Sequence, residues 1–241
     1  MLKVTNLSVK YNPSDEYALK DVEYTVQSGE RIAVIGANGA GKSTLLLALT
    51  GILAHDSGEI AIGGVIMEKK TLREIRKKAG MIFQNPDDQL FMPTVYEDIS
   101  FGPRNYDSPE HEIETKMDEV LSRLNISHLK WRLSNKLSGG EKRLAALASV
   151  LIMEPALLLM DEPTSFLDPK ARRRLIRFLD TLPQTMIIAT HDLDLALDLC
   201  QRTILLKEGQ IHTDAAARDV LRDASLLDEC SLELPLSFQK R

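Results

Sequence analysis

The chain has 241 residues, of which 44% are hydrophobic and 27% charged, a composition typical of a globular protein with one or two domains. Its net charge of −5 argues against general attraction to nucleic acid, which needs a basic face. Cys200 and Cys230 have no metal-type spacing and no disulfide framework, as is typical of a reducing cytoplasm. We expect neither a secretory signal nor a membrane span, because the apolar runs stop well short of about 18 residues.

An antiparallel sheet is predicted at the beginning of the chain. Residues 1–30 alternate apolar and polar side chains, and the pair Gly63-Gly64 separates two β-branched runs within residues 60–67. Such a pair between two apolar runs is a hairpin signal. Three later runs are short and continuously apolar, as buried parallel strands are: residues 31–36, 157–161 and 186–190.

The first of these apolar runs leads into a glycine loop and then a helix. The pattern Gly36-x4-Gly41-Lys42-Ser43 lets main-chain N–H groups approach phosphate oxygens, and the helix N-terminus adds a favourable partial charge. Lys42 is expected to reach the β- and γ-phosphates, and the Ser43 hydroxyl to bind Mg²⁺. The alternative is a structural glycine turn before a buried helix. The predicted ATP-binding loop comprises Gly36, Ala37, Asn38, Gly39, Ala40, Gly41, Lys42, Ser43 and Thr44.

Residues 85–153 are charged and helix-prone, with prolines in the early part, and this predicts a helical part inserted between core strands. Within it, Ser138 and Glu141 form a capping-box pattern around Gly139 and Gly140. Capping of the following helix explains this pattern by itself. Capping does not explain why the chain has a second helix that begins at glycines and whose N-terminus suits phosphate, in addition to the helix after Gly41.

The other two apolar runs end at side chains suited to hydrolysis, at the sheet edge where open α/β folds bind ligands. Asp161 is expected to serve Mg²⁺, directly or through water, and Glu162 to orient or deprotonate the attacking water. The alternative for this acidic pair is helix capping. His191 follows the third run and, as a neutral imidazole, can hold the attacking water and sense the γ-phosphate. A structural role is the commoner one for a lone histidine at a strand end.

After Gly209 the sequence is polar and helix-like, and it ends in LELPLSFQKR, to which composition assigns no role. We expect a single domain over 1–241. Its nucleotide-binding core spans 1–84 and 154–212, with the helical part at 85–153 and a C-terminal helical tail at 213–241.

Together these motifs resemble those of ATP-binding cassette (ABC) ATPases, from GANGAGKST at 36–44 through LSGGE at 137–141 to LLLMDEP at 157–163. The resemblance implies an α/β fold: a P-loop NTPase core with a parallel sheet, an N-terminal antiparallel β subdomain and an inserted α-helical subdomain. It also implies hydrolysis of ATP with Mg²⁺. In the family the signature lies in trans, against ATP held by a second subunit, and here it comprises Ser138, Gly139, Gly140 and Glu141.

The same resemblance implies roles for residues outside these motifs. Gln84 matches the Q-loop glutamine, which contacts Mg²⁺ and the attacking water and links the site to a membrane partner. His191 matches the switch histidine. Tyr11 stands 25 residues before the loop, like the family's aromatic residue that stacks on adenine, with Tyr17 as a competitor. The predicted Mg²⁺ set is therefore Ser43, Gln84 and Asp161.

Ser165 and Asp168 match the D-loop at the family's dimer interface. Two positions depart from the family pattern. Glu141 stands where glutamine is usual, which brings a negative charge near phosphate unless the capping box turns the carboxylate away. Phe166 stands where a small residue is common, which is expected to alter interface packing.

The string FQNPDDQLF at 83–91, continued by MPTVYEDISFGP at 92–103, closely resembles ATPase subunits of energy-coupling-factor importers, particularly the cobalt and nickel type. The resemblance implies a peripheral subunit at the cytoplasmic face of the cell membrane that powers uptake of cobalt, nickel or a vitamin. Its implied partners are a second ATPase subunit, identical or a close paralogue, a transmembrane energy-coupling subunit and a substrate-binding membrane subunit. The alternatives are an exporter or unrelated importer subunit, and a soluble mechanical ATPase, which usually brings a second cassette, a coiled coil or a basic face.

Overall fold

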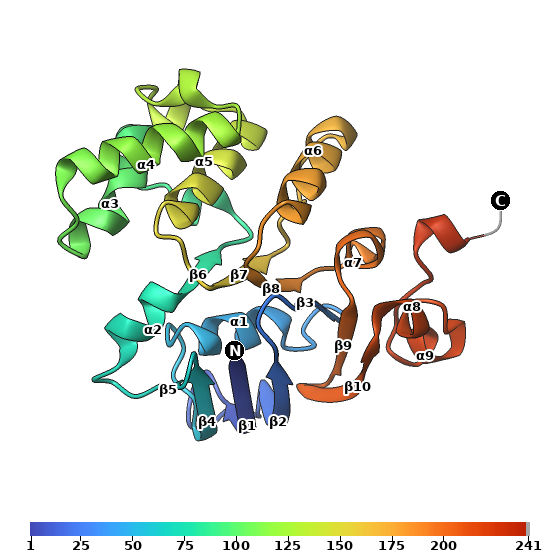
Figure 1. Cartoon of the computed structure of the whole chain (residues 1–241). Coiled ribbons are helices and arrows are strands. Elements are labelled where there is room, and N and C mark those ends of the chain that lie inside the picture. Colours follow the sequence, from blue (N-terminus) through green and yellow to red (C-terminus); the bar gives the residue numbers. More distant parts are fainter. Residues whose placement is uncertain (240–241) are drawn as a thin grey trace. The chain divides into compact units, whose positions relative to one another are not determined.

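The computed structural model describes residues 1–239 (Figure 1), so the last two residues of the predicted tail at 213–241 lie outside it. The chain divides into two compact units. The first comprises Met1–Met81, Ala156–Glu162 and the chain from Leu182 onward, and the second comprises Ile82–Pro155 and Pro163–Thr181. The domain boundaries expected from the sequence stay a prediction.

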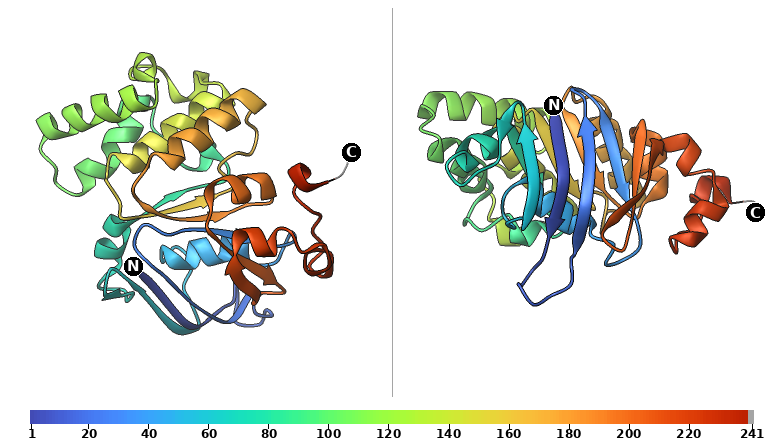
Figure 2. Two further views of the ribbon diagram at one scale, coloured as in Figure 1. Left: turned by 45° about the vertical axis from the view of Figure 1, so that its right-hand side comes forward. Right: turned by 90° about the horizontal axis from the view of Figure 1, so that it is seen from below.

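A four-stranded antiparallel sheet in the first unit has the order β2-β1-β4-β5, and Figure 2 shows its strands side by side in the right-hand view. The tight Gly63-Gly64 turn joins β4 to β5, with Ile62 opposite Val65, so the predicted hairpin is confirmed. From Val22 to Val26, the side chains at alternate positions of β2 are buried, as expected for a sheet with one covered face. The strands are β1 Leu2–Val9, β2 Leu19–Val26, β4 Ser57–Ile62 and β5 Val65–Ile66.

A six-stranded sheet in the same unit has the order β10-β9-β3-β8-β7-β6. The three apolar runs predicted as buried strands form β3, β7 and β8, and β8 pairs in parallel with both of the others. Every residue of β7 and β8 is buried, which confirms the parallel core. The strands are β3 Arg31–Ile35, β6 Ala79–Ile82, β7 Leu157–Asp161, β8 Thr185–Ala189, β9 Arg202–Lys207 and β10 Gln210–Ala216.

The expectation of helix-like sequence after Gly209 was wrong for residues 210–216. This stretch is β10, which pairs antiparallel with β9, and its residues alternate between exposed and half-buried. The period of two that marks a strand is carried here by Ile211, Thr213 and Ala215, which are too mixed in character to give an apolar signal. Helices begin at Ala217.

Several helices of the first unit contact the six-stranded sheet. Helix α1 contacts β7 and β8, and α7 contacts β3. The C-terminal turn η4 contacts α7, where the Asp194 carboxylate accepts hydrogen bonds from the N–H groups of Leu236 and Ser237 at 3.0 and 3.2 Å. The bounds are α1 Lys42–Leu49, α2 Leu72–Lys78, α7 Leu193–Leu199, α8 Ala217–Val220, α9 Ala224–Glu229 and η4 Leu236–Phe238.

The second unit is helical, as the fold class predicted for the inserted part. Its core forms where α5 contacts both α3 and α4, around fully buried side chains such as Ile99, Met117 and Ala148. None of the helices in the described chain is both long and apolar enough to cross a bilayer. The bounds are η1 Pro86–Asp88, α3 Val95–Asn105, α4 Glu110–Arg123, η2 Ser127–Leu129, η3 Ser134–Lys136, α5 Gly139–Leu151 and α6 Pro169–Asp180.

Candidate active site

The loop between β3 and α1 requires glycine at both of its ends. Gly36 and Gly41 have φ of 153° and 105°, a region that side-chain-bearing residues seldom adopt. A Cβ atom on Gly36 would lie 2.4 Å from the carbonyl oxygen of Leu206, and one on Gly41 would lie 2.7 Å from Leu19 Cδ2. The loop can therefore pack closely against β9 and β2 while its middle, at Asn38, stays exposed.

Lys42, the first residue of α1, turns its ammonium group back over this loop. Nζ donates hydrogen bonds to the carbonyl oxygens of Gly36 and Ala37, at 2.8 and 3.0 Å. Burial lowers the pKa of Lys42, and the nearby negative charges of Glu162 and Asp161 act in the opposite direction. A buried cation thus lies within electrostatic reach of two carboxylates, at the N-terminus of a helix that favours anions.

Tyr11 is held beside the first turn of α1. Its hydroxyl forms a hydrogen bond with Thr44 Oγ1 at 2.9 Å, while the side chain remains 57% exposed. The competing Tyr17 has the Lys10 ammonium over its ring, 4.4 Å from the centroid. The structure therefore brings Tyr11 to the predicted loop with an accessible ring. Its role in adenine stacking stays a prediction.

Glu162 is buried at the end of β7 and is held by residues at the end of β8. Its carboxylate accepts hydrogen bonds from Thr190 Oγ1 at 3.1 Å and from the His191 main-chain N–H at 2.9 Å. His191 Nδ1 lies 2.8 Å from Glu162 Oε1. A neutral imidazole with its proton on Nδ1 donates to this oxygen and keeps Nε2 as an acceptor. The His191 side chain is 68% exposed, so it is accessible to a ligand.

Thr190 is a site residue that the sequence analysis missed. It is fully buried, and its Oγ1 also accepts a hydrogen bond from Asp192 N at 3.0 Å, so it fixes both the carboxylate of Glu162 and the turn that carries His191. The one available signal was a hydroxyl residue directly after an apolar strand and before a histidine.

The oxygen donors of the first unit fit Mg²⁺, which binds through few carboxylates and keeps other positions for phosphate oxygens or water. Ser43 is exposed at the start of α1, and Asp161 is buried at the end of β7. Residues 1–239 contain no group of three or more His, Cys, Asp or Glu side chains able to hold a metal ion. Ser43 and Asp161 supply two oxygen donors, and further donors are needed to complete an Mg²⁺ site. Gln84, the third predicted ligand, belongs to the second unit.

In the second unit, Gln84 is exposed and its main chain is fixed by the helix that follows the signature. The guanidinium of Arg143, on α5, donates hydrogen bonds to the carbonyl oxygens of Phe83, at 2.6 Å, and Gln84. The Gln89 amide donates to the Ala146 carbonyl of the same helix at 2.7 Å. Residues 83–89 and α5 are therefore linked by buried and half-buried side chains. Arg143 was not among the site residues predicted from the sequence.

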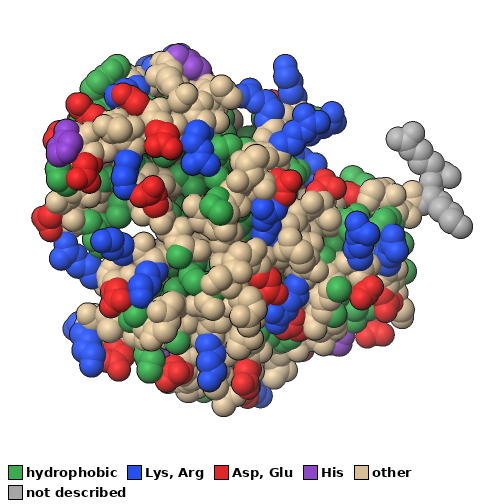
Figure 3. Space-filling model, viewed as in Figure 1, with side chains coloured by type: hydrophobic (Ala, Val, Ile, Leu, Met, Phe, Trp, Pro, Cys, Tyr) green, Lys and Arg blue, Asp and Glu red, His purple; other side chains and the backbone are tan. Residues whose placement is uncertain are grey.

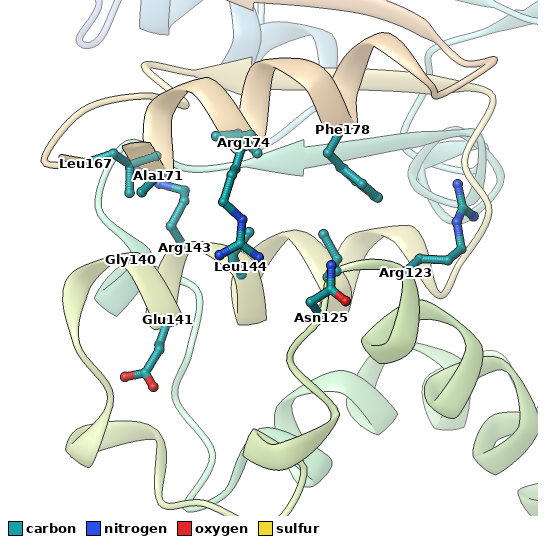
Figure 4. Close-up of a pocket in the computed structure, with 12 residues that line it drawn as sticks. Arg123, Asn125, Gly140, Glu141, Arg143, Leu144, Leu167, Ala171, Arg174 and Phe178 are labelled. Atoms are coloured by element: carbon teal, nitrogen blue, oxygen red, sulfur yellow. The ribbon is translucent and has the colours of Figure 1, made fainter. Parts of the chain in front are cut away.

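The predicted signature forms the capping box expected at the start of α5. Glu141 Oε2 accepts hydrogen bonds from Ser138 N and Ser138 Oγ, both at 2.8 Å. These bonds lower the pKa of Glu141. Figure 4 shows the carboxylate directed away from α6. A Cβ atom on Gly139 would have no neighbour within 4 Å, so this glycine presents open main chain to the solvent.

A cavity of about 230 Å³ lies next to the signature, between α5 and α6 (Figure 4). Its lining combines apolar side chains such as Leu144 and Phe178 with Arg123 and Arg174, and the Arg123 guanidinium lies over the Phe178 ring at 5.8 Å. Figure 3 shows Lys and Arg side chains gathered over α6. In sequence these are Lys170, Arg172, Arg173, Arg174 and Arg177.

The predicted D-loop lies close to the signature within the second unit. A cavity of about 210 Å³ is lined by Gly139 of the signature, Ser165 and Phe166 of this loop, and Pro86 of the Q-loop region. Phe166 is 84% exposed. Asp168 caps α6, because its Oδ1 accepts hydrogen bonds from Lys170 N and Ala171 N at 2.8 and 2.9 Å. The roles of these residues at a dimer interface stay predictions.

The known proteins that this chain resembles belong to one family. The profile described as "ABC transporter" matches residues 19–165. The chain is 47% identical to an ABC transporter ATP-binding protein of Geobacter sulfurreducens, with 94% of this chain and 91% of the relative covered. It is 42% identical to the energy-coupling factor transporter ATP-binding protein EcfA of Methanothermobacter thermautotrophicus, with coverage of 98% and 77%.

Two solved structures have the same fold. CbiO1 of Clostridium perfringens, part of the ABC transporter complex CbiONQ, has a TM-score of 0.83 and 37% identity, with 95% of this chain and 93% of that chain covered. The ATP-binding cassette MJ0796, solved as a dimer bound to ADP and phosphate, has a TM-score of 0.80 and 28% identity, with coverage of 90% and 99%. These likenesses confirm the predicted fold class.

Proposed function

The chain belongs to the ABC transporter family and is an ATPase, and on this premise we propose that it powers an importer of the energy-coupling-factor type. The observation that best supports ATP hydrolysis is the buried Glu162 carboxylate. Thr190 and His191 hold it in place, and its negative charge raises the pKa of Lys42 in the glycine loop, against the effect of burial. Similarity to EcfA and CbiO1 supports the importer type.

In the proposed reaction, the glycine loop and Lys42 bind the β- and γ-phosphates of ATP, and Tyr11 stacks on the adenine. Glu162 takes a proton from the attacking water, which His191 Nε2 orients by accepting a second hydrogen bond from it. Thr190 keeps Glu162 in place by donating a hydrogen bond to Oε2, the carboxylate oxygen that His191 does not contact. Ser43, Asp161 and Gln84 would hold Mg²⁺, which would supply positive charge to offset the negative charge of the phosphates.

We infer that two ATPase subunits enclose each ATP together. The open main chain at Gly139 and the helix start at Ser138 suit a γ-phosphate, and the dimeric MJ0796 structure supports a paired arrangement. The capping box supports tolerance of Glu141 at this position, because Ser138 holds its carboxylate. Ser165 and Asp168 then belong to the loop that faces the second subunit. This second subunit is either identical or a close paralogue.

The membrane partners are proposed to be a transmembrane energy-coupling subunit and a substrate-binding subunit, with this chain peripheral at the cytoplasmic face. An exposed aromatic surface in the second unit supports docking of such a partner. Phe91 and Trp131 are 62% and 67% exposed, and Trp131 stacks on Tyr96 with 4.5 Å between ring centroids. Large exposed aromatic side chains are typical of interaction sites.

The test is to purify the chain with the membrane proteins that accompany it and to reconstitute the complex in vesicles. We expect ATP-dependent uptake of labelled cobalt, nickel or a vitamin, and no uptake when Glu162→Gln replaces the wild-type chain. Purification without any membrane protein, together with association with ribosomes or DNA, would instead favour the soluble mechanical ATPase.

A further inference from the structure

Asp98 lies on α3 and connects two segments that the proposed function uses for different purposes. The residue is 5% exposed, and Oδ1 accepts hydrogen bonds from the main-chain N–H groups of Phe91 and Met92, both at 2.9 Å. Oδ2 accepts a third from the Ser134 hydroxyl at 2.7 Å. Both oxygens of one buried side chain are thus engaged, each with a different segment of the chain.

The first segment contains part of the exposed aromatic surface. The ring of Phe91 meets Phe101 edge to face, with 4.9 Å between centroids, and Asp98 fixes the main chain of Phe91 rather than its ring. A partner that contacts this ring therefore pushes on a residue whose main-chain N–H is hydrogen-bonded directly to Asp98.

The second segment leads into the signature. Ser134 is the first residue of η3, and its carbonyl oxygen accepts a hydrogen bond from Leu137 N at 3.4 Å, one residue before Ser138. Ser134 N also donates to the Pro93 carbonyl at 2.9 Å. The turn that places Ser138 is consequently fixed to the Phe91 segment through its main chain at Pro93 and through the side chain of Asp98.

A carboxylate is a costly choice for this position. Burial raises the pKa of Asp98, although the hydrogen bonds from Met92, Ser134 and Phe91 act in the opposite direction. Asparagine has the same shape, a carbonyl oxygen for the two N–H groups, and an amide that can donate to Ser134. Hydrogen-bond geometry and charge can therefore be separated by a single substitution.

We propose that Asp98 is a positioning residue that couples the partner-facing segment 91–92 to the signature. It does so by holding that segment and the turn 134–136 in a fixed position relative to each other. Displacement of Phe91 by the membrane partner then moves Ser138. This inference rests on the proposed importer function, because it needs a partner at Phe91.

The experiment compares ATP hydrolysis by the reconstituted complex with hydrolysis by the isolated chain, and so measures stimulation by the partner. Ser134→Ala removes the bond between Asp98 and the turn but leaves the two N–H bonds at 91–92. The matched control is Ser100→Ala, because Ser100 is also buried on α3 and its hydroxyl donates to the Glu97 carbonyl of the same helix. Asp98→Ala removes the whole link, and Asp98→Asn preserves its geometry.

We expect Ser134→Ala to lower partner stimulation by about fivefold or more, the lower end of typical coupling between sites, and Asp98→Ala to lower it further. The KM for ATP should match that of Ser100→Ala, and Asp98→Asn should restore stimulation. Equal stimulation in Ser134→Ala and Ser100→Ala, or equal losses in Asp98→Asn and Asp98→Ala, would overturn the inference.

If Asp98→Ala does not fold, the two serine variants decide. A wild-type complex without stimulation would contradict the importer function itself. Normal wild-type stimulation with indistinguishable serine variants would contradict only the role of Asp98.

Discussion

At the scale of single residues, the proposed chemistry depends on Glu162. Its carboxylate is buried, and its main chain has a φ of 46° at the end of β7. Non-glycine residues adopt this left-handed conformation only when surrounding contacts enforce it. Three such contacts come from the end of β8: the hydroxyl of Thr190, the N–H of His191 and its Nδ1. A base held this way needs little rearrangement when water and ATP bind.

Replacing Glu162 by glutamine tests this assignment. Glutamine keeps an acceptor oxygen for His191 N but cannot take a proton, so hydrolysis should fall by about 10²–10⁴-fold, the usual contribution of a general base. ATP binding should persist. Phosphate release and calorimetric ATP binding measure the two effects, with Thr190→Ser as a control that keeps the hydroxyl. An unchanged hydrolysis rate would refute Glu162 as the base.

Lys42→Ala should weaken nucleotide binding by about ten- to a hundredfold, because hydrogen bonds to charged groups contribute about 1.5–3 kcal/mol. The Tm should not fall, since burial lowers the pKa of Lys42 and the folded state therefore carries this charge at a cost. Calorimetry with ATP measures the affinity, and Lys78→Ala, at a surface ion pair with Glu74, is the control. Equal affinities in the two variants would remove Lys42 from the phosphate site.

Sequence reasoning at this scale found the groups with distinctive chemistry and missed those that hold them. Glycine spacing and carboxylates after apolar strands have few explanations, so Gly36, Lys42 and Glu162 could be identified. Thr190 and Arg143 act through contacts with residues 28 and about 60 positions away, and no local pattern reports such contacts.

At the scale of elements, the start of α5 combines helix capping with the proposed signature role. Glu141→Gln keeps the capping box, which accepts either residue, and removes one negative charge. We therefore expect a slightly lower Tm at neutral pH, because the stabilising charge of the carboxylate is lost, and ATP-driven pairing that is equal or tighter. Glu141→Ala removes the two hydrogen bonds from Ser138 to the side chain but leaves the Ser138 hydroxyl as the N-cap, so the Tm should fall further than in Glu141→Gln. Thermal unfolding and sedimentation with ATP measure the two effects, and weaker pairing in Glu141→Gln than in wild type would contradict the expectation.

The pH dependence of the capping box has a definite sign. The hydrogen bonds from Ser138 lower the pKa of Glu141, so its contribution is complete above the ordinary carboxyl pKa and is lost as pH falls through the lowered folded value. The Glu141→Gln variant lacks this contribution to the pH dependence. The difference in Tm between wild type and Glu141→Gln should therefore change below the ordinary carboxyl pKa, and a constant difference would contradict the assignment.

Sequence patterns predicted elements where burial is strong and failed where it is partial. The strands β7 and β8 are buried at every position, so their apolar runs were unambiguous. In β10 no residue is buried, and the propensities of QIHTDAA alone favoured the wrong element. Pairing with β9 decides its conformation, and that pairing is a tertiary effect.

At the scale of the whole molecule, the aromatic surface of the second unit should matter for transport and not for ATP binding. Phe91→Ala and Tyr96→Ala should each reduce uptake per ATP hydrolysed in the reconstituted complex, while nucleotide affinity of the isolated chain stays unchanged. The control is Ile66→Ala, another exposed apolar residue, located on β5 of the first unit. Normal coupled uptake in the Phe91 and Tyr96 variants would count against this docking surface.

The most direct test of the shared ATP site is sedimentation of Glu162→Gln with ATP and Mg²⁺, alone and combined with Gly139→Asp. A side chain at Gly139 meets no atom within 4 Å, and an acidic residue suits the first turn of a helix, so the double variant should fold and bind ATP. We predict that Glu162→Gln becomes a dimer and that the double variant stays monomeric, because the added carboxylate repels the phosphate of the second subunit. A monomeric Glu162→Gln at saturating ATP, or equal dimerisation of both variants, would contradict the shared site.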